Sequence, residues 1–573
     1  MAVLTLLFSL SVLVSTPVFA QEQKVSGSIP CQPDKVTGDT WLQANLEYML
    51  GYQNEIYSKW EDALNNYSKA LACDTSSPYL QMQVARMLFK LGRTEEATLK
   101  LEDVLKQDPA NVSALMYLGE LYNAQKRVDE AILLYERALK AEPEKTEALL
   151  FIGVLYASKQ DFEKSQACFD KVLAKEPENL LAMYYLGTLY IEKKNYKAAE
   201  TQFKKIVELN PNFYAAYLNL GLISETRGRP KDAEEYYNKA LALNPQNLYI
   251  RERLAQLYIS GKSYDKAVKE LEEIAKNIPN VDIHFKLGML YLQEKEYDKA
   301  ASEFRVVTSA RPSDILSRYY LALTLDELKL YDEAIVQLKK ILEYDPRNIN
   351  AFLSLAFIYV KQERLAEAAR VYEEVLSFDQ SRGEVFAELG NIYIQAKDYK
   401  RAEETLNRGL SLFRDNADLN FAMAVLFEKT GKTDQMFVFL KRTIEINPKH
   451  ADALNFLGYS YADKGINLDE ALSLIRSALE LKPGSGYIID SLGWVYFRLG
   501  KLDEALKQLK RSLETVKDDP VLYEHLGDVY EASGQPKEAL DAWNNSIKYH
   551  AKEEGLKARV EEKISQLKKK YKL

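Results

Sequence analysis

The sequence predicts an all-α solenoid, in which about fifteen helix-turn-helix units stack one after another. An alanine recurs in a fixed frame from Ala63 to Ala539, which is fourteen steps averaging 34 residues, with Ser165 and Met436 in two of the places. Each step holds two segments whose apolar residues are three, four or seven apart, the spacing of an amphipathic helix. Ten of the seventeen prolines fall where a unit ends, because proline stops one helix and suits the first turn of the next.

Residues 1–20 are expected to form a secretory signal peptide. An apolar run from Ala2 to Val14 is followed by Pro17 and the small-residue ending Val18-Phe19-Ala20, although no Lys or Arg precedes the run. Cleavage after Ala20 would leave an exported chain. An uncleaved N-terminal anchor is the alternative, since this stretch is close to the length that spans a bilayer.

Residues 21–43 are expected to be a flexible linker, because glycine, serine and proline are frequent there. The chain has three cysteines, Cys31, Cys73 and Cys168. Cys31 and Cys73 are able to pair in an oxidising compartment. A chain of this size does not depend on disulfides, however, so free thiols are the favoured interpretation.

The third unit shows how the array at residues 44–550 is expected to pack. Leu115, Leu118 and Tyr122 share one face of the first helix, and Tyr135 and Ala138 share one face of the second. A glycine at the eighth place of many units should let the two helices approach closely. Each pair has apolar surface that it cannot cover alone, so the units must stack on their neighbours.

This pattern resembles the tetratricopeptide repeat family over about residues 44–550. Eight places of the family pattern are matched in full by one unit: Leu115, Leu118, Gly119, Tyr122, Ala131, Tyr135, Ala138 and Pro143. The resemblance implies a right-handed superhelix with a long concave face, on which family members hold polypeptide partners.

Two regions depart from the pattern. Gln380 and Arg414 replace the terminal proline and Met436 replaces the frame alanine, so residues 380–440 are either a hinge or, as we favour, degenerate repeats that still pack. One residue is inserted near Gly465 to Asn467, and we expect it to lengthen the turn between the two helices of that unit.

Residues 551–573 are expected to form a C-terminal capping helix. Leu556, Val560, Ile564 and Leu567 share one face, and lysines and arginines occupy the others. Solenoids need a final helix with a polar back to cover their exposed end. The alternative is that this basic tail contacts lipid headgroups or an acidic partner.

Composition and motifs argue against several functions. A net charge of −8 and a pI near 5.5 disfavour nucleic-acid binding. The four histidines lack a second metal ligand at helical spacing, and neither a phosphate-binding loop nor a nucleophile elbow occurs. We therefore expect no catalytic, metal or cofactor site and no small-molecule substrate. A composite site of Glu524, His525 and Asp528 is the rival, enzymatic interpretation.

Candidate binding residues follow from the family's concave positions, which are the second, fifth, ninth and twelfth places of each first helix. Carried over to this chain, they give a groove that is mainly apolar and aromatic and becomes acidic near the C-terminus. The alternative is that a tight superhelix buries part of this face against itself. The candidates are Tyr184, Ile191, Leu218, Leu222, Phe285, Met289, Tyr319, Phe357, Tyr459, Tyr487, Asp490, Trp494, Phe497, Glu524 and Asp528.

The family's clamp for a peptide's terminal carboxylate is not matched here. It needs Lys or Arg together with Asn, and only Arg86 and Asn391 or Asn455 occur, each in isolation. Chaperone-tail binding is therefore disfavoured. An aromatic-lined channel for an extended or helical polypeptide is the functional interpretation, and Trp494 and Phe497 are expected to be dispensable for the architecture.

The stretch from Ala453 to Trp543 also resembles bacterial exported or outer-membrane-associated members of the family, some of which act as protease adaptors. This resemblance implies a non-enzymatic scaffold or adaptor of the periplasm or cell envelope, whose partner is an envelope protease or an assembly complex. Such proteins are often lipoproteins, and the lipobox is missing here, so peripheral membrane association stays open. The alternative function is a structural component of an envelope polysaccharide or protein secretion machine.

Overall fold

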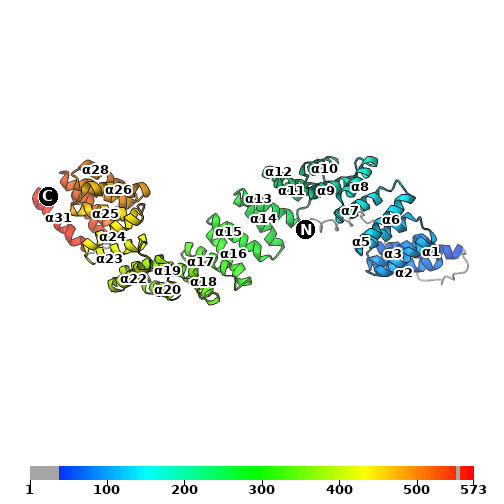
Figure 1. The fold of residues 1–573 in the computed structure, drawn as a ribbon, viewed down its shortest axis with the longest axis horizontal. Helices are drawn as coiled ribbons and strands as arrows, with labels where there is room; N and C mark the ends of the chain where they lie inside the picture. Colours follow the sequence, from blue (N-terminus) through cyan, green and yellow to red (C-terminus); the bar gives the residue numbers. More distant parts are fainter. Residues whose placement is uncertain (1–37, 550–554, 573) are drawn as a thin grey trace. The chain divides into compact units, whose positions relative to one another are not determined.

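The computed structural model describes residues 38–549 and 555–572, and the described residues form 31 helices and no strand. The chain divides into two compact units, at Asn277 and Ile278. Figure 1 shows the helices of each unit following one another in chain order. The helices of the first unit are α1 (Gly38–Ile56), α2 (Trp60–Cys73), α3 (Pro78–Lys90), α4 (Thr94–Gln107), α5 (Val112–Ala124), α6 (Val128–Ala141), α7 (Thr146–Ser158), α8 (Phe162–Lys175), α9 (Leu180–Glu192), α10 (Tyr196–Leu209), α11 (Tyr214–Thr226), α12 (Pro230–Leu243), α13 (Leu248–Ser260) and α14 (Tyr264–Asn277).

The second unit continues the same alternation and ends in an additional helix. Its helices are α15 (Val281–Gln293), α16 (Tyr297–Ala310), α17 (Ile315–Glu327), α18 (Tyr331–Tyr344), α19 (Ile349–Lys361), α20 (Leu365–Phe378), α21 (Gly383–Gln395), α22 (Tyr399–Leu412), α23 (Ala417–Lys429), α24 (Thr433–Ile446), α25 (Ala451–Lys464), α26 (Leu468–Leu481), α27 (Gly486–Arg498), α28 (Leu502–Leu513), α29 (Pro520–Ala532), α30 (Pro536–Lys548) and α31 (Leu556–Tyr571). The prediction of fifteen helix pairs followed by a C-terminal cap is confirmed.

Local sequence explains where the helices begin and end. The Asn111 side chain caps α5 by accepting a hydrogen bond from the Ala114 N–H at 3.1 Å. The chain reverses within a pair through a residue in the left-handed region, such as Lys126 (φ 61°) or Gly228 (φ 68°). Helix α6 ends two residues before Pro143, as the role assigned to the terminal proline predicts.

Close contact within a pair depends on the glycine at the eighth place. A Cβ added to Gly119 would lie 2.7 Å from the Tyr135 ring, and one added to Gly187 would lie 2.8 Å from the Phe203 ring. Tyr135 and Phe203 are buried, so these rings have no free space to move into. The predicted close approach is confirmed, and a larger residue at these glycines would overpack the core at a cost of roughly 1–3 kcal/mol.

The insertion in the thirteenth pair does not lengthen its turn, so that prediction is wrong. Helix α25 has 14 residues where α27 has 13, and each is followed by a three-residue turn. The helix absorbs the additional residue, and the turn is closed by two left-handed residues, Gly465 (φ 70°) and Asn467 (φ 47°). Both residue types tolerate this conformation.

The junctions within residues 380–440 are packed, as expected for degenerate repeats. Phe386 is completely buried, and Gly409 leaves room for it, because a Cβ at Gly409 would lie 2.8 Å from Phe386. Met436 is also buried in the place of the frame alanine. Where the terminal proline is missing, the Asp379 carboxylate accepts hydrogen bonds from Ser381 and Arg382.

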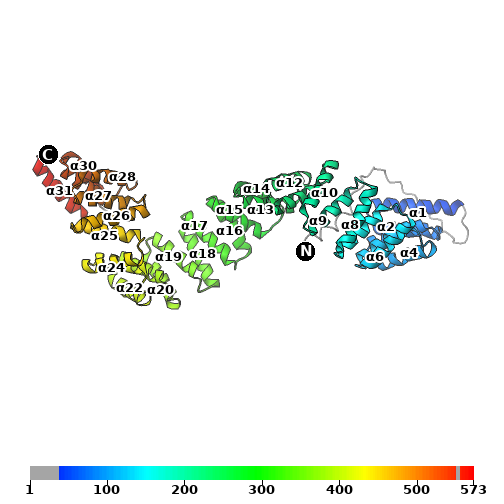
Figure 2. The same cartoon turned by 45° about the horizontal axis from the view of Figure 1, so that its top comes forward.

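Helix α31 covers the apolar end of the second unit. Its Leu556, Val560 and Leu567 are completely buried and form one cluster with Ala539 and Trp543 of α30. Figure 2 shows α31 beside α30 at the C-terminal end of this unit.

One of the boundaries predicted near the N-terminus differs in the structure. Helix α1 already begins at Gly38, so the linker predicted for residues 21–43 is too long at its C-terminal end. The signal peptide predicted for residues 1–20 lies outside the described residues. Within the described helices, none has the length and hydropathy needed to cross a bilayer.

The expectation of free thiols is wrong at Cys73, which is disulfide-bonded. A large chain does not need a disulfide for stability. Whether a disulfide forms depends instead on whether two thiols come within reach of each other. Cys31, the candidate partner, lies outside the described residues. Cys168 is free and half-buried.

Candidate protein-binding surface

The predicted binding residues lie on first helices and fall into three groups. The first-unit patch consists of Tyr184 and Ile191 on α9 and Leu218 and Leu222 on α11. The aromatic patch consists of Phe285 and Met289 on α15, Tyr319 on α17 and Phe357 on α19. The C-terminal cluster consists of Tyr459 on α25, Tyr487, Asp490, Trp494 and Phe497 on α27, and Glu524 and Asp528 on α29.

The first-unit patch is mostly used for packing. The Tyr184 ring lies 5.8 Å from Phe203 and 5.6 Å from Phe213, and burial raises the pKa of its hydroxyl. Leu218 is buried, so the prediction that it faces a partner is wrong. The physical reason is that α11 buries residues around most of its circumference, and a helix of that kind becomes part of the core. Ile191 and Leu222 stay partly accessible.

The aromatic patch is more open. The half-buried Phe285 ring packs against Phe304 at 5.9 Å and Tyr320 at 6.0 Å, which fixes its orientation. Ser354 on α19 donates a hydrogen bond to the Tyr319 hydroxyl at 3.3 Å, so neighbouring first helices are tied together.

Phe357 is the most exposed member of the aromatic patch. Its side chain is 54% exposed, and the Lys361 ammonium lies 4.6 Å from the ring centre. Lys361 is in turn paired with Asp326 of α17 at 2.8 Å. A charged pair therefore flanks an uncovered ring, and the patch offers an aromatic contact surface with a polar edge.

In the C-terminal cluster, the carboxylates of Glu524 and Asp528 are bound by the chain's own last helix. The Glu524 carboxylate is 5% exposed and accepts two hydrogen bonds from Arg559, at 2.8 and 2.7 Å, and one from Lys563 at 2.7 Å. Asp528 accepts from Lys563 at 2.7 Å and from the Trp543 indole N–H at 3.0 Å. The prediction that Glu524 and Asp528 await a partner is therefore wrong, because α31 neutralises them.

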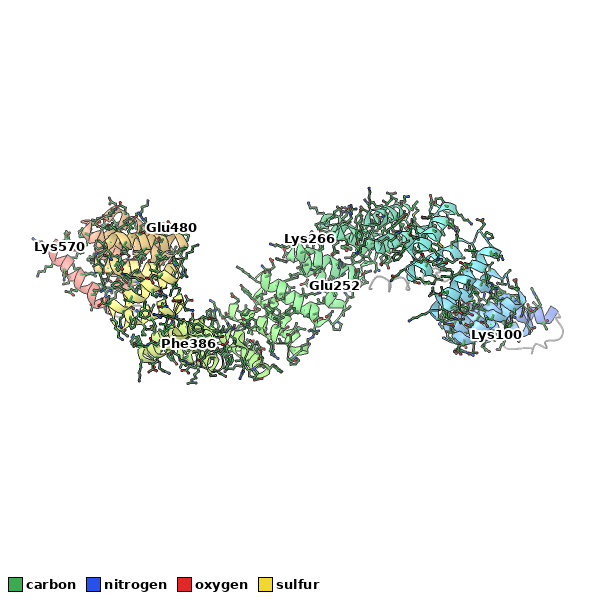
Figure 3. All side chains as sticks on the ribbon, in the orientation of Figure 1. Lys100, Glu252, Lys266, Phe386, Glu480 and Lys570 are labelled. Carbon is green, nitrogen blue, oxygen red and sulfur yellow. The ribbon has the colours of Figure 1, made fainter. Side chains whose placement is uncertain are left out.

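The basic side chains of α31 continue toward the C-terminal end of the helix. The Lys570 ammonium, labelled at the C-terminal end in Figure 3, lies 3.2 Å from a Glu531 carboxylate oxygen. The acidic partner considered for this basic segment thus belongs to the same chain.

These contacts set the protonation of the two acids. Burial opposes a charged Glu524, but the hydrogen bonds from Arg559 and Lys563 outweigh it and hold the pKa of Glu524 below its usual value. Burial raises the pKa of Asp528, and Lys563 offsets this only in part.

His525 joins the predicted residues into one buried network. Its Nδ1 lies 3.0 Å from the Asp490 carboxylate, and its ring stacks on Trp494 with the ring centres 4.1 Å apart. The Tyr459 hydroxyl lies 3.5 Å from its Nε2. Burial lowers the pKa of His525, but the charge of Asp490 and its hydrogen bond outweigh burial and raise it overall.

Trp494 is not dispensable for the architecture, contrary to the prediction. Its side chain is 7% exposed because His525 covers one face of the ring, and Phe497 packs at 5.0 Å. Phe497 is half-buried. Tyr487, one turn from the network, is 63% exposed and is the open member of this cluster.

The cluster has little capacity for chemistry as it stands. Both carboxylates of the composite site are paired with cations, and the His525 imidazole is held between Asp490 and Trp494. Over residues 38–549 and 555–572, no group of His, Cys, Asp and Glu side chains is arranged to hold a metal ion.

Sequence reasoning missed Arg559 and Lys563 as the partners of Glu524 and Asp528. The signal was present in the spacing, since each pair is 35 residues apart, close to the length of one unit. Helix α31 therefore docks where the first helix of a further unit would lie. Its basic residues take the same fifth and ninth places as the two acids.

Models of one repeat family match most of the chain. A model described as "Cytochrome c-type biogenesis protein H TPR domain" matches residues 93–213. Further models described as "Tetratricopeptide repeat" match residues 189–247, 226–286, 281–314, 317–348 and 353–558.

Individual relatives resemble this chain more weakly. The "TPR repeat-containing protein PA4667" of Pseudomonas aeruginosa is 36% identical over 103 residues, which is 18% of this chain and 18% of that relative's own length. A crystal structure of a tetratricopeptide repeat protein from Parabacteroides merdae is 25% identical, with a TM-score of 0.32, and the match covers 43% of this chain and 98% of that one. A chain of the APC/C hetero-tetramer Cut9-Hcn1 is 13% identical, with a TM-score of 0.37, covering 85% and 96%.

Proposed function

Since this chain is a tetratricopeptide repeat protein, we propose that it is a non-enzymatic scaffold that binds partner polypeptides on its first helices. The observation that carries the proposal is the uneven exposure of the predicted groove residues. Phe357 and Tyr487 are more than half exposed, whereas Trp494 and Leu218 are less than a tenth exposed. Exposed aromatic side chains on rigid helices are typical anchors of protein interfaces.

The aromatic patch fits an extended or helical segment with apolar side chains. Phe285 and Tyr319 are already fixed by their neighbours, so they lose little conformational freedom when a ligand packs on them. The Lys361 and Asp326 pair at its edge is suited to polar or main-chain groups of the partner. Preorganised rings with a polar edge describe a peptide-binding surface better than a small-molecule pocket.

The test is to remove the two exposed rings and follow partner capture. Phe357→Ala with Tyr487→Ala should abolish co-purification of the partners that the wild-type chain retains from native membranes and periplasm. Val438→Ala is the matched control, because Val438 is 64% exposed but lies on the second helix α24. Equal capture by all three proteins would refute the proposal.

The proposed place of action is the periplasm or cell envelope of a bacterium, as the leader-like residues 1–20 suggest. The mature chain should then begin at Gln21, and N-terminal sequencing of the native protein distinguishes this from a retained N-terminal anchor. A native chain that keeps residues 1–20 and fractionates with the cytoplasm would contradict the envelope assignment.

A structural role in an assembly machine is the second candidate. It is favoured by the match of residues 93–213 to a model named for cytochrome c-type biogenesis. An envelope protease remains the other class of partner. Mass spectrometry of the captured proteins separates the two: subunits of one stoichiometric complex indicate an assembly role, and a protease with its substrates indicates an adaptor.

A further inference from the structure

Helix α1 carries an exposed apolar stripe along its outer side. The six largest contributors are Trp41 (64% exposed), Leu42 (61%), Leu46 (40%), Met49 (67%), Tyr52 (53%) and Ile56 (53%). A contiguous apolar stripe of this size is unusual for a free protein surface and marks an interaction site.

The opposite side of α1 is already committed to its own unit. Glu47 is buried and accepts a hydrogen bond from Asn66 of α2 at 2.7 Å. A Cβ at Gly51 would lie 2.7 Å from the Tyr67 ring, so α1 and α2 are in close contact there. The stripe therefore lies on the side of α1 that is opposite to the side packed into the core. Figure 2 shows α1 beside α2 in the first unit.

The two terminal helices differ in the charge of their outer sides. α31 has Lys568, Lys569 and Lys570 in its last turn. The exposed residues of α1 between Trp41 and Tyr57 include no charged side chain. A solenoid end in water needs a polar back. The end formed by α1 lacks one, which is expected if another surface covers it.

The spacing of the stripe is that of a coiled-coil seam. Leu42, Leu46, Met49, Gln53 and Ile56 are separated by four, three, four and three residues. This alternation places them on a single line that another helix can follow for the whole of α1, which is about 28 Å long.

Gln53 is the polar member of the seam and selects the orientation of the second helix. In a parallel pair of identical helices, Gln53 meets Gln53, and the two amides hydrogen-bond to each other. In an antiparallel pair centred on Met49, position 53 lies opposite position 45, so the two Gln53 amides no longer meet and lie nearest to Asn45 and Leu46. A single polar residue at such a position commonly fixes register and orientation.

Charge and area both suit a second copy of this chain. An uncharged stripe brings no like charges together when it packs on itself across a two-fold axis. Six half-exposed side chains of this size supply roughly 600 Å² per copy, close to the ~800 Å² per partner of a standard interface. We infer that the chain forms a parallel homodimer through α1. This inference does not depend on the proposed groove function.

The test is the mass of the full chain in solution. At roughly 50 µM, above the micromolar dissociation constants of the weakest standard-size interfaces, sedimentation equilibrium should give twice the 65.6 kDa chain mass. Met49→Glu places two carboxylates together in the seam and should weaken association at least about 100-fold. Val438→Glu is the control, since Val438 is 64% exposed on another helix, and this variant should remain dimeric. Circular dichroism verifies that each variant is folded.

Orientation is tested by cross-linking. Gln53→Cys in a Cys168→Ser background should give a cross-linked dimer on mild oxidation, whereas an antiparallel pair cross-links only when Leu42→Cys is mixed with Ile56→Cys. A monomeric wild-type chain, or a Met49→Glu variant that remains dimeric, overturns the inference. A chain without residues 1–20 that stays monomeric and binds neutral phosphatidylcholine vesicles through α1 also overturns it.

Discussion

The aromatic patch and the C-terminal cluster occupy the same places of the repeat, but they differ in how much of their side chains the neighbouring helices cover. Phe357 takes the ninth place of α19 and is 54% exposed, whereas Trp494 takes the ninth place of α27 and is 7% exposed. The difference arises from the following helices, because His525 of α29 stacks on Trp494. The position in the repeat decides which direction a side chain faces. The neighbouring unit decides whether that side chain is available to a partner.

The largest expected effect comes from truncating the buried ring. Trp494→Ala should destabilise the second unit by about 3–5 kcal/mol, because it removes a packed indole and leaves a cavity beside His525. Urea unfolding followed by circular dichroism measures the change. A loss below about 1 kcal/mol would mean that the ring is not part of the core.

The second-largest effect on stability is expected from removing the lysine that pairs with Glu524 and Asp528. Lys563→Met leaves Asp528 with only the Trp543 indole as a partner, so we expect a loss of about 2–4 kcal/mol in the same assay. Lys563→Arg should restore most of it. Lys557→Met is the control, because Lys557 is half-exposed and its ion pair with Glu561 is long, at 4.0 Å.

The buried histidine should make stability depend on pH. Its folded-state pKa is raised, so the stabilisation is complete below the ordinary histidine pKa of about 6.5 and is lost as pH rises through the folded value. His525→Gln should reduce the loss of stability that urea unfolding records as the pH rises above about 6.5. A wild-type chain that gains stability over that range would contradict the charge assigned to His525.

The smallest expected effect on stability belongs to the open ring. Phe357→Ala should change the free energy of unfolding by less than about 1 kcal/mol, because half of the side chain is already in water. Partner capture should fall sharply in the same variant. A large loss of stability would place Phe357 in the core and remove it from the binding surface.

The sequence predicted the repeating architecture well, because the 34-residue period arises from packing between neighbouring helices. The glycine and aromatic pair of Gly119 and Tyr135 and the capping role of Leu556 and Val560 follow from patterns within one or two units. The concave positions carried over from the family include Phe357 and Tyr487, and both side chains are more than half exposed.

What periodicity did not predict is which side chains are covered by the next unit. Its place in the repeat predicts Glu524 as an acidic docking residue, but Arg559, 35 residues later, binds its carboxylate. The inserted residue near Gly465 likewise had two solutions, a longer turn or a longer helix, and only the three-dimensional packing distinguishes them. Such outcomes depend on pairs of units, which a pattern within one unit does not describe.

Site-specific photo-cross-linking in living cells tests the division between open and covered places most directly. A photoreactive phenylalanine analogue replaces Phe357, Tyr487, Trp494 or Val438 in four separate strains. We expect adducts with another polypeptide from positions 357 and 487 and none from positions 494 and 438. Adducts confined to position 494 or 438, or none from positions 357 and 487, would contradict the proposed binding surface.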